Sequence, residues 1–121
     1  MTPEAQRIAI AEACGWKWQE GEEPTYGGSF KSTGWYDHKD KWHTGGWKNK
    51  TRGLPDYLND LNAIREAEKV LTERQELFYL VRLTDAMKVS ATIGWQIEKT
   101  YHASAAQRAE AFLKTIGKWI D

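Results

Sequence analysis

The stretch VSATIGWQIEKTY, residues 89–101, decides the fold class, because apolar and polar side chains alternate along it. One face is apolar except for Lys99, and the other is polar. This alternation is typical of a strand in an antiparallel sheet that buries one of its sides. The sequence therefore predicts a half-buried β-strand here. Its apolar face is formed by Val89, Ala91, Ile93, Trp95, Ile97 and Tyr101.

A helix is predicted on each side of this strand. Thr72 with Gln75, and Ser104 with Gln107, have the spacing of a capping box, which marks the first turn of a helix. The helix that begins at Thr72 is expected to end at about Lys88. Its inward face is expected to consist of Leu77, Leu80, Val81 and Thr84. The stripe on the last helix consists of Ala105, Ala109, Phe112, Leu113 and Ile116.

Two more helices are predicted upstream. Thr2 and Pro3 suit an N-cap and a first helical position, and Gly15 can end a helix that runs to about Ala13. Within residues 54–72, Asp56 is a plausible N-cap for another helix. One face of that helix carries Tyr57, Leu61, Ile64 and Leu71.

The region between these two helices has the pattern of strands and loops. Residues 16–18 alternate as a strand, and residues 20–34 read as a long loop with room for a strand fragment near Phe30. Residues 34–47 resemble a β-hairpin with its turn within 37–41. The expected order is α-β-β-β-α-α-β-α. Strands and helices are not regularly interleaved, so we predict an α+β fold with a mainly antiparallel sheet packed with helices.

Composition limits the class of protein. A chain of 121 residues fits one domain, 1–121, and the single Cys14 has no internal disulfide partner. No apolar run reaches the ~18 residues of a membrane span, and no signal peptide is evident, so we expect a soluble, cytoplasmic protein. The net charge is zero, which makes nucleic-acid binding an unfavoured expectation. Residues 31–52 carry an excess of basic side chains, and residues 53–79 an excess of acidic ones. This distribution fits a solvated loop followed by a solvated helix face. It also fits a basic rim that meets an anionic ligand.

The residues do not form a pattern typical of an enzyme. His38 and His43 lie in a predicted loop with few oxygen donors nearby, so no metal site is expected. Cys14, at the end of a helix, reads as a structural thiol rather than a nucleophile. The sequence contains neither a nucleophile elbow nor a phosphate-cradling Gly-rich motif. We therefore expect no catalytic residues and no cofactor.

The aromatic content favours binding. The chain has seven Trp, and rings beside Lys and Arg suit flat, anionic ligands. Arg108, one turn into the last helix, could grip an anion or pair with Glu110 or another surface acid. Asn59 and Asn62 could read a base edge or tie down a neighbouring loop. The candidate ligand-binding residues are Trp47, Arg52, Tyr57, Asn59, Asn62 and Arg108.

Three segments carry a resemblance to a known group. LPDYLNDLNAIREAEKVLT at 54–72, ASAAQRAEAFLKTIGKW at 103–119 and, in looser form, residues 8–16 resemble small bacteriophage proteins of the phage ABA-sandwich family. The overall plan is also similar to the first-described Thoeris anti-defence sponge proteins. That resemblance implies sequestration of cyclic signalling nucleotides, and assembly as dimers or hexamers with ligand pockets between subunits. It assigns no residues, and the stretch 26–52 has no counterpart.

The function expected from the sequence is therefore a phage anti-defence activity in the host cytoplasm. The protein would bind and sequester a cyclic ADP-ribose isomer or a cyclic oligonucleotide without cleaving it. The alternative is a phage protein-interaction module that inhibits a host factor through a Trp-rich surface. A small enzyme acting on nucleotides and a single-stranded nucleic-acid binder are further alternatives.

Overall fold

A computed structural model describes residues 1–21, 32–45, 49–87 and 102–121, and the fold is α+β, as predicted. Four helices and three strands lie within these ranges. They are α1 (Pro3–Ala13), β1 (Lys17–Gln19), β2 (Gly34–Tyr36), β3 (Trp42–Thr44), α2 (Leu61–Glu68), α3 (Glu73–Met87) and α5 (Ala105–Thr115). The predicted strand at 89–101, the fragment near Phe30 and the candidate Trp47 lie outside the described residues.

The three strands form an antiparallel sheet in the order β1-β2-β3. The predicted hairpin is confirmed: Trp35 lies opposite Trp18 on one side and His43 on the other. Its turn falls within residues 37–41, where Asp37 Oδ1 accepts the backbone N–H groups of Lys39 and Lys41. Trp35 is a buried aromatic residue of the sheet, and its indole N–H donates to the carbonyl of residue 50 at 2.6 Å. The sheet is therefore joined to the segment that leads to α2.

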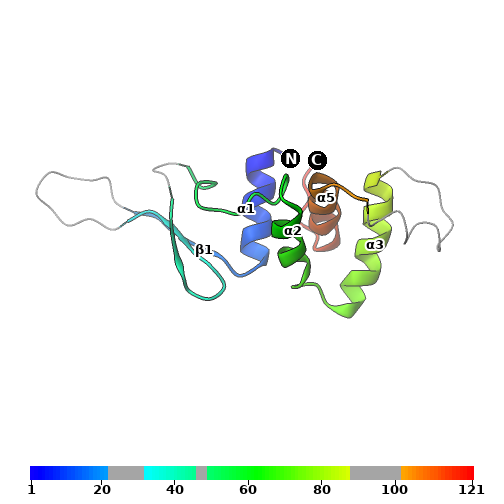
Figure 1. The fold of residues 1–121 in the computed structure, drawn as a ribbon, viewed down its shortest axis with the longest axis horizontal. Helices are drawn as coiled ribbons and strands as arrows, with labels where there is room; N and C mark the ends of the chain where they lie inside the picture. The colour runs from blue at the N-terminus through cyan, green and yellow to red at the C-terminus, as the bar shows by residue number, and fades with distance from the viewer. Residues whose placement is uncertain (22–31, 46–48, 88–101) are drawn as a thin grey trace, which may run out of the picture.

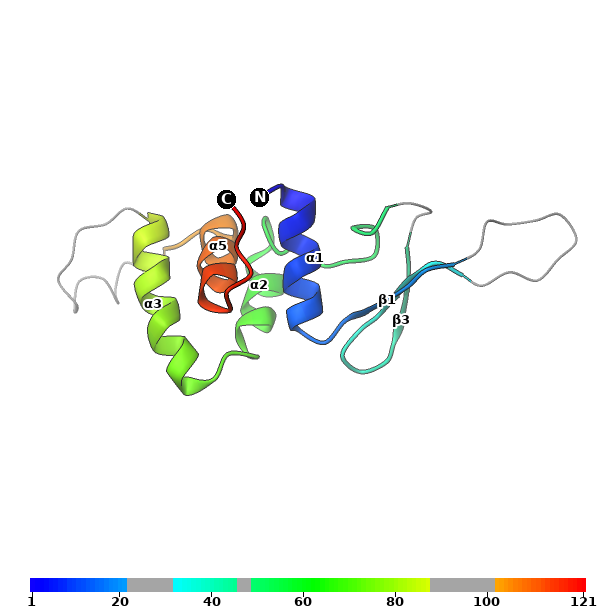
Figure 2. The ribbon, with the colours of Figure 1, turned by 180° about the vertical axis from the view of Figure 1, so that it is seen from behind.

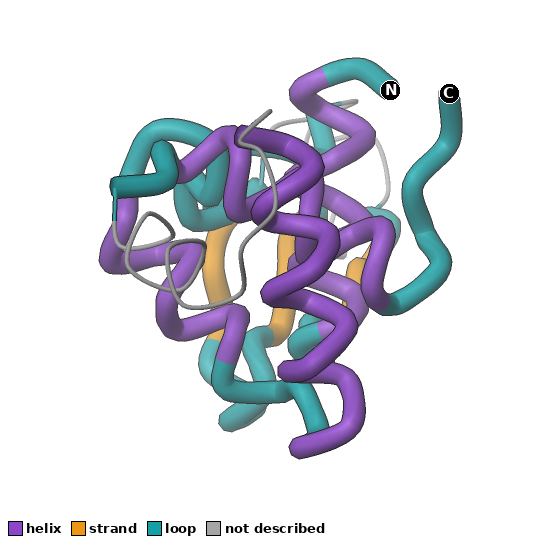
Figure 3. Tube along the Cα trace, turned by 90° about the vertical axis from the view of Figure 1, so that its right-hand side faces the viewer, coloured by secondary structure: helices purple, strands orange, loops and turns teal. Residues whose placement is uncertain are grey.

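The sheet lies at one end of the molecule and α3 at the other (Figures 1 and 2). Between them lie α1, α2 and α5, and α5 contacts all three other helices. In the view turned by 90°, the strands lie behind the helices (Figure 3). Within the described ranges the four helices thus all lie on one side of the sheet. None of the described helices has the length and apolar character needed to cross a membrane.

The core is centred on α5, and the predicted stripe on this helix is confirmed. Ala109, Phe112 and Leu113 are fully buried, Ala105 is 5% exposed, and Ile116 packs at the edge of the core. The predicted capping box at the start of α5 is also present. Ile10 of α1, Ile64 of α2 and Leu83 of α3 meet the same core.

The predicted start of the helix within residues 54–72, with Asp56 as its N-cap, is wrong. The side chain of Asp56 accepts the side-chain amide of Asn59 rather than a helical backbone N–H, and residues 57–59 make a single turn. Asp60 is the N-cap, because its carboxylate accepts the N–H of Asn62, and α2 runs only from Leu61 to Glu68. As a result, Tyr57 belongs to the approach to the helix and not to its face.

The predicted inward face of α3 is also wrong in part. Leu77 and Val81 are 69% and 58% exposed, whereas Tyr79, Leu83 and Thr84 are buried. Apolar residues surround this helix, so periodicity does not decide which side packs. The packing against α5 decides it. The predicted capping box of Thr72 and Gln75, which starts the helix, is confirmed.

Candidate functional site

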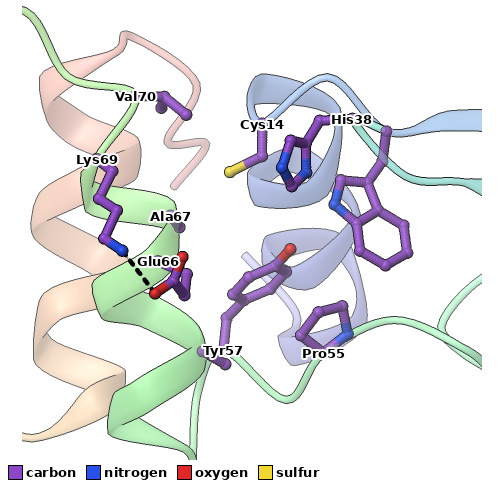
Figure 4. Close-up of a pocket in the computed structure, with 10 residues that line it drawn as sticks. Cys14, His38, Pro55, Tyr57, Glu66, Ala67, Lys69 and Val70 are labelled. Carbon is purple, nitrogen blue, oxygen red and sulfur yellow. Dashed lines mark hydrogen bonds and ion pairs between the residues drawn. The ribbon is translucent and has the colours of Figure 1, made fainter. Parts of the chain in front are cut away.

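A cleft of about 390 Å³ opens between the end of α1 and α2 (Figure 4). The segments that line it come from four parts of the chain: the end of α1 with the start of β1, the β2–β3 turn, the approach to α2, and α2 with the residues that follow it. The lining residues are Cys14, Trp16, His38, Pro55, Tyr57, Ala63, Glu66, Ala67, Lys69 and Val70. Most of these side chains are apolar or aromatic, as is usual for small-molecule sites.

The first wall of the cleft is Trp16, which follows the turn at the end of α1. Gly15 has a φ of +90°, a conformation that costs glycine little, and it turns the chain back toward the helix. The Trp16 backbone N–H donates to the carbonyl of Ala11 at 3.0 Å, which fixes the start of the strand. The Trp16 ring packs against the His43 ring, with 4.7 Å between centroids. The indole is therefore held by both α1 and the hairpin.

His43 is in turn held by Asp37, the residue that also organises the hairpin turn. The distance from His43 Nε2 to Asp37 Oδ2 is 2.9 Å. The hydrogen bond from His43 is the largest cause that lowers the pKa of Asp37 to about 2. The carboxylate is therefore ionised at neutral pH and supports Trp16 through His43.

The floor of the cleft is Tyr57, which is 3% exposed. Burial raises the pKa of its hydroxyl well above the usual value, so the group stays neutral. The segment before it is fixed by Arg7 of α1, whose guanidinium donates to the carbonyls of residues 51, 54 and 55 at 2.9–3.3 Å. Arg7 thus places Pro55 and Tyr57 against α1.

The rim of the cleft carries an exposed ion pair between Glu66 and Lys69. Lys69 Nζ lies 2.7 Å from Glu66 Oε1, and the two side chains are 70% and 72% exposed for Lys69 and Glu66 respectively. The hydrogen bond from Lys69 lowers the pKa of Glu66. Exposed pairs of this kind contribute little to stability, so an anionic ligand could recruit the ammonium group at small cost.

Cys14 points into the cleft beside His38 (Figure 4). Burial raises the pKa of its thiol to about 11, so little thiolate exists at neutral pH. A nucleophilic cysteine needs a lowered pKa. The thiol is therefore suited to packing against a ligand rather than to attacking it.

Together these groups make a cleft lined by the aromatic rings of Trp16 and Tyr57, with the ammonium group of Lys69 at its rim. No set of three or more His, Cys, Asp or Glu side chains within the described ranges is arranged to hold a metal ion. No family model, no curated protein and no solved structure matches this chain.

Of the sequence candidates that fall within the described residues, Tyr57 alone lines this cleft. Arg52, Asn59 and Asn62 are exposed elsewhere, and Trp47 lies outside the described residues. The Asn59 amide donates to the neighbouring Asp56 carboxylate, which is the local tie expected as the alternative to base reading. A binding role for these residues stays a prediction.

Arg108 is buried, being 7% exposed, and it pairs with an acid, as one of the two expectations held, although that acid is Glu68 and not Glu110. A role for Arg108 in anion binding stays a prediction. Its guanidinium donates to Glu68 of α2 at 3.1 Å, and Glu110 pairs with Lys114 instead. Tyr79 of α3 donates to the same Glu68 oxygen at 2.8 Å. This network joins three helices in the interior, so Arg108 serves the fold at this position.

Sequence reasoning missed Trp16, His38 and Lys69 as parts of a site. Trp16 was assigned to a strand on local alternation alone, and the other two lie in turns. The available signal was Gly15, because a glycine after a helix turns the chain back toward that helix. The meeting of this turn with α2 depends on tertiary packing.

Proposed function

We propose that this protein binds a small, flat, charged molecule in the cleft and holds it without chemical change. The observation that carries the proposal is the arrangement of Trp16 and Tyr57 around a cavity of about 390 Å³ with Lys69 at its rim. This volume is near the lower end of the roughly 300–1,000 Å³ typical of ligand pockets. One ring system with its sugar fits such a space, with charged groups at the opening.

The ligand class that we propose is a cyclic nucleotide-type signal, either a cyclic ADP-ribose isomer or a cyclic oligonucleotide. A base stacked on an aromatic ring gains about 1–3 kcal/mol, and a hydrogen bond to a charged group about 1.5–3 kcal/mol. Trp16, Tyr57 and Lys69 supply groups of these kinds. The resemblance of residues 54–72 and 103–119 to phage proteins supports this ligand class.

We further propose that the protein is a bacteriophage anti-defence sponge that acts in the host cytoplasm. It includes an ABA-sandwich arrangement of the whole chain and assembly into a homo-oligomer. A sponge must retain its ligand more tightly than the host receptor does, at roughly nanomolar affinity, or about −12 kcal/mol. It needs no nucleophile, which agrees with the raised pKa of Cys14.

The test is a thermal-shift screen of cyclic dinucleotides, cyclic trinucleotides and cyclic ADP-ribose isomers on the purified chain. We expect one ligand class to raise the melting temperature and to be recovered intact after heat release. Stabilisation follows from binding to the folded state, and saturation at 100 times the dissociation constant adds about 2.7 kcal/mol. The absence of any shift at millimolar ligand would refute the proposal, and a changed ligand mass would show an enzyme.

Matched variants locate the ligand. Trp16→Leu and Lys69→Ala should weaken binding at least about fivefold, because each removes a contact worth about 1 kcal/mol or more. Trp119→Leu and Lys17→Ala are the controls, since neither residue lines the cleft. Equal effects of the Trp16 and Trp119 variants would place the ligand elsewhere.

The alternative function, inhibition of a host factor by protein contact, is favoured by one observation. Tyr36 and Trp42 lie on neighbouring strands with their rings tilted by 60° and 5.0 Å between ring centroids, and both remain partly exposed. Paired aromatic rings on a surface are suited to a protein interface. A Trp42→Ala variant that lost capture of a specific host protein, while wild type bound no nucleotide, would favour this function.

A further inference from the structure

The outward side of α3 carries apolar side chains that nothing in the described structure covers. Leu77, Phe78 and Val81 are 69%, 53% and 58% exposed. Arg74 and Asp85, also exposed, lie on the same side of the helix, one near each end. These five residues form what we call the α3 outer face.

The spacing of these residues makes the face continuous. Positions 74, 78, 81 and 85 follow one another at intervals of four, three and four, so they form one stripe along the helix, with Leu77 beside it. The opposite side of α3 carries the buried Tyr79 and Leu83, which pack toward α5. Among the described residues the outer face thus takes no part in the core, and α3 lies at one end of the molecule (Figures 1 and 2).

The α3 outer face is complementary to itself in one orientation. About a two-fold axis at the middle of the helix, between Tyr79 and Leu80, an antiparallel second copy places the partner's Asp85 opposite Arg74. The same operation places the partner's Val81 opposite Phe78. Opposite charges meet at both ends, and apolar side chains meet in the centre. A parallel pair would instead place Arg74 against the partner's Arg74.

We propose that two copies of this chain associate through α3, packed antiparallel about this two-fold axis. In this isologous arrangement both copies use the same surface, so Arg74 and Asp85 of each copy both face an opposite charge on the other copy. The interface is separate from the cleft, since none of the five residues lines it.

The size of the surface predicts how the dimer behaves. A helix of 15 residues is about 22 Å long, so a contact confined to α3 falls below the roughly 1,200 Å² of standard interfaces. The dimer is therefore in equilibrium with the monomer. The dimer fraction rises with protein concentration and falls with salt, because the end pairs are exposed.

The test is sedimentation velocity of the full chain over a hundredfold range of concentration. Leu77→Glu should abolish the dimer, because it places two carboxylates in the apolar centre. The matched control is Ile120→Glu, since Ile120 has the same 69% exposure and lies outside α3. A wild-type chain that stays monomeric throughout, or a dimer that survives Leu77→Glu, would overturn the proposal.

Charge reversal tests the orientation. Arg74→Asp alone and Asp85→Arg alone should each weaken the dimer about tenfold, because each replaces two attractive pairs with two repulsive ones. The double variant should restore the wild-type dimer. If the double variant is weaker than both single variants, the antiparallel pairing is wrong. Ligand binding by Leu77→Glu is measured in parallel, so a failure of the cleft and a failure of the interface are told apart.

Discussion

At the scale of single residues, the side chain of Glu68 connects three helices, α2, α3 and α5. One of its oxygens accepts hydrogen bonds from Tyr79 of α3 and Arg108 of α5, while the residue itself ends α2. Its side chain is 21% exposed and that of Arg108 9%, so water screens the pair only partly. A partly buried charged network of this kind is costly to break from one side.

Glu68→Leu should therefore lower the free energy of unfolding by about 1–3 kcal/mol, because it removes the acceptor of two hydrogen bonds in the interior. The measurement is urea denaturation followed by tryptophan fluorescence. Glu66→Leu, two residues earlier, is the control, because Glu66 is exposed and should behave nearly as wild type. Equal losses in both variants would contradict an interior role for Glu68.

Cys14 provides a second prediction at this scale. Burial raises the pKa of its thiol from 9.0 to about 11, which at pH 8 reduces the thiolate fraction about a hundredfold. Labelling by a disulfide reagent should therefore be about a hundredfold slower in the native protein than in urea. A bound ligand in the cleft should slow it further. Native labelling as fast as that of the unfolded chain would show that the thiol is not buried.

At the scale of elements, the hairpin depends on a close approach at Gly34. A Cβ atom at this position would lie 2.4 Å from the carbonyl oxygen of His43 and 2.8 Å from the Trp42 ring. Both contacts are shorter than side chains tolerate, and one involves backbone. The strand β3 can therefore lie beside β2 with this register only if position 34 has no side chain.

Gly34→Ala should destabilise the protein by about 2 kcal/mol or more, because β2 and β3 must separate to admit the methyl group. Gly117→Ala is the control: its φ of +75° costs about 1 kcal/mol, but no atom lies within 4 Å of the added Cβ. Chemical denaturation of both variants gives the comparison. A smaller loss at Gly34 than at Gly117 would contradict the close approach.

At the scale of the whole molecule, the cleft joins the sheet end to the helices, and its Trp16 wall depends on the Asp37–His43 contact. The folded-state pKa of Asp37, about 2, is below its ordinary value of 3.8. Between these values the unfolded state binds the proton more readily. The stability that this contact adds is thus complete above about pH 4 and is lost as the pH falls toward 2.

The measurement is the free energy of unfolding as a function of pH for wild type and Asp37→Asn. The difference between them should be constant near neutral pH and should shrink between pH 4 and 2. Asp40→Asn is the control, since Asp40 is exposed at the tip of the same turn. A difference that stays unchanged down to pH 2 would show that Asp37 does not act through its charge.

Features that depend on a few neighbouring residues were predictable from the sequence. The caps at Thr2, Thr72 and Ser104 and the hairpin turn formed as expected, because each is closed by hydrogen bonds within about four residues. The apolar stripe of α5 was also predictable, because one side of this helix is distinctly apolar. The start of α2 was misplaced because Asp56 and Asp60 are equally good caps by local criteria.

The burial of Arg108, the outward turn of Leu77 and the cleft itself were decided only when the elements packed together. A helix that carries apolar residues all round does not specify which side will meet a neighbour. Likewise, the sequence around an arginine does not identify the distant acidic residue with which it pairs. Those choices depend on contacts between residues as far apart as Glu68 and Arg108, separated by forty positions. Local chemistry set where the helices and strands begin and end, whereas the mutual packing of α1, α2, α3 and α5 set which side chains are available to bind.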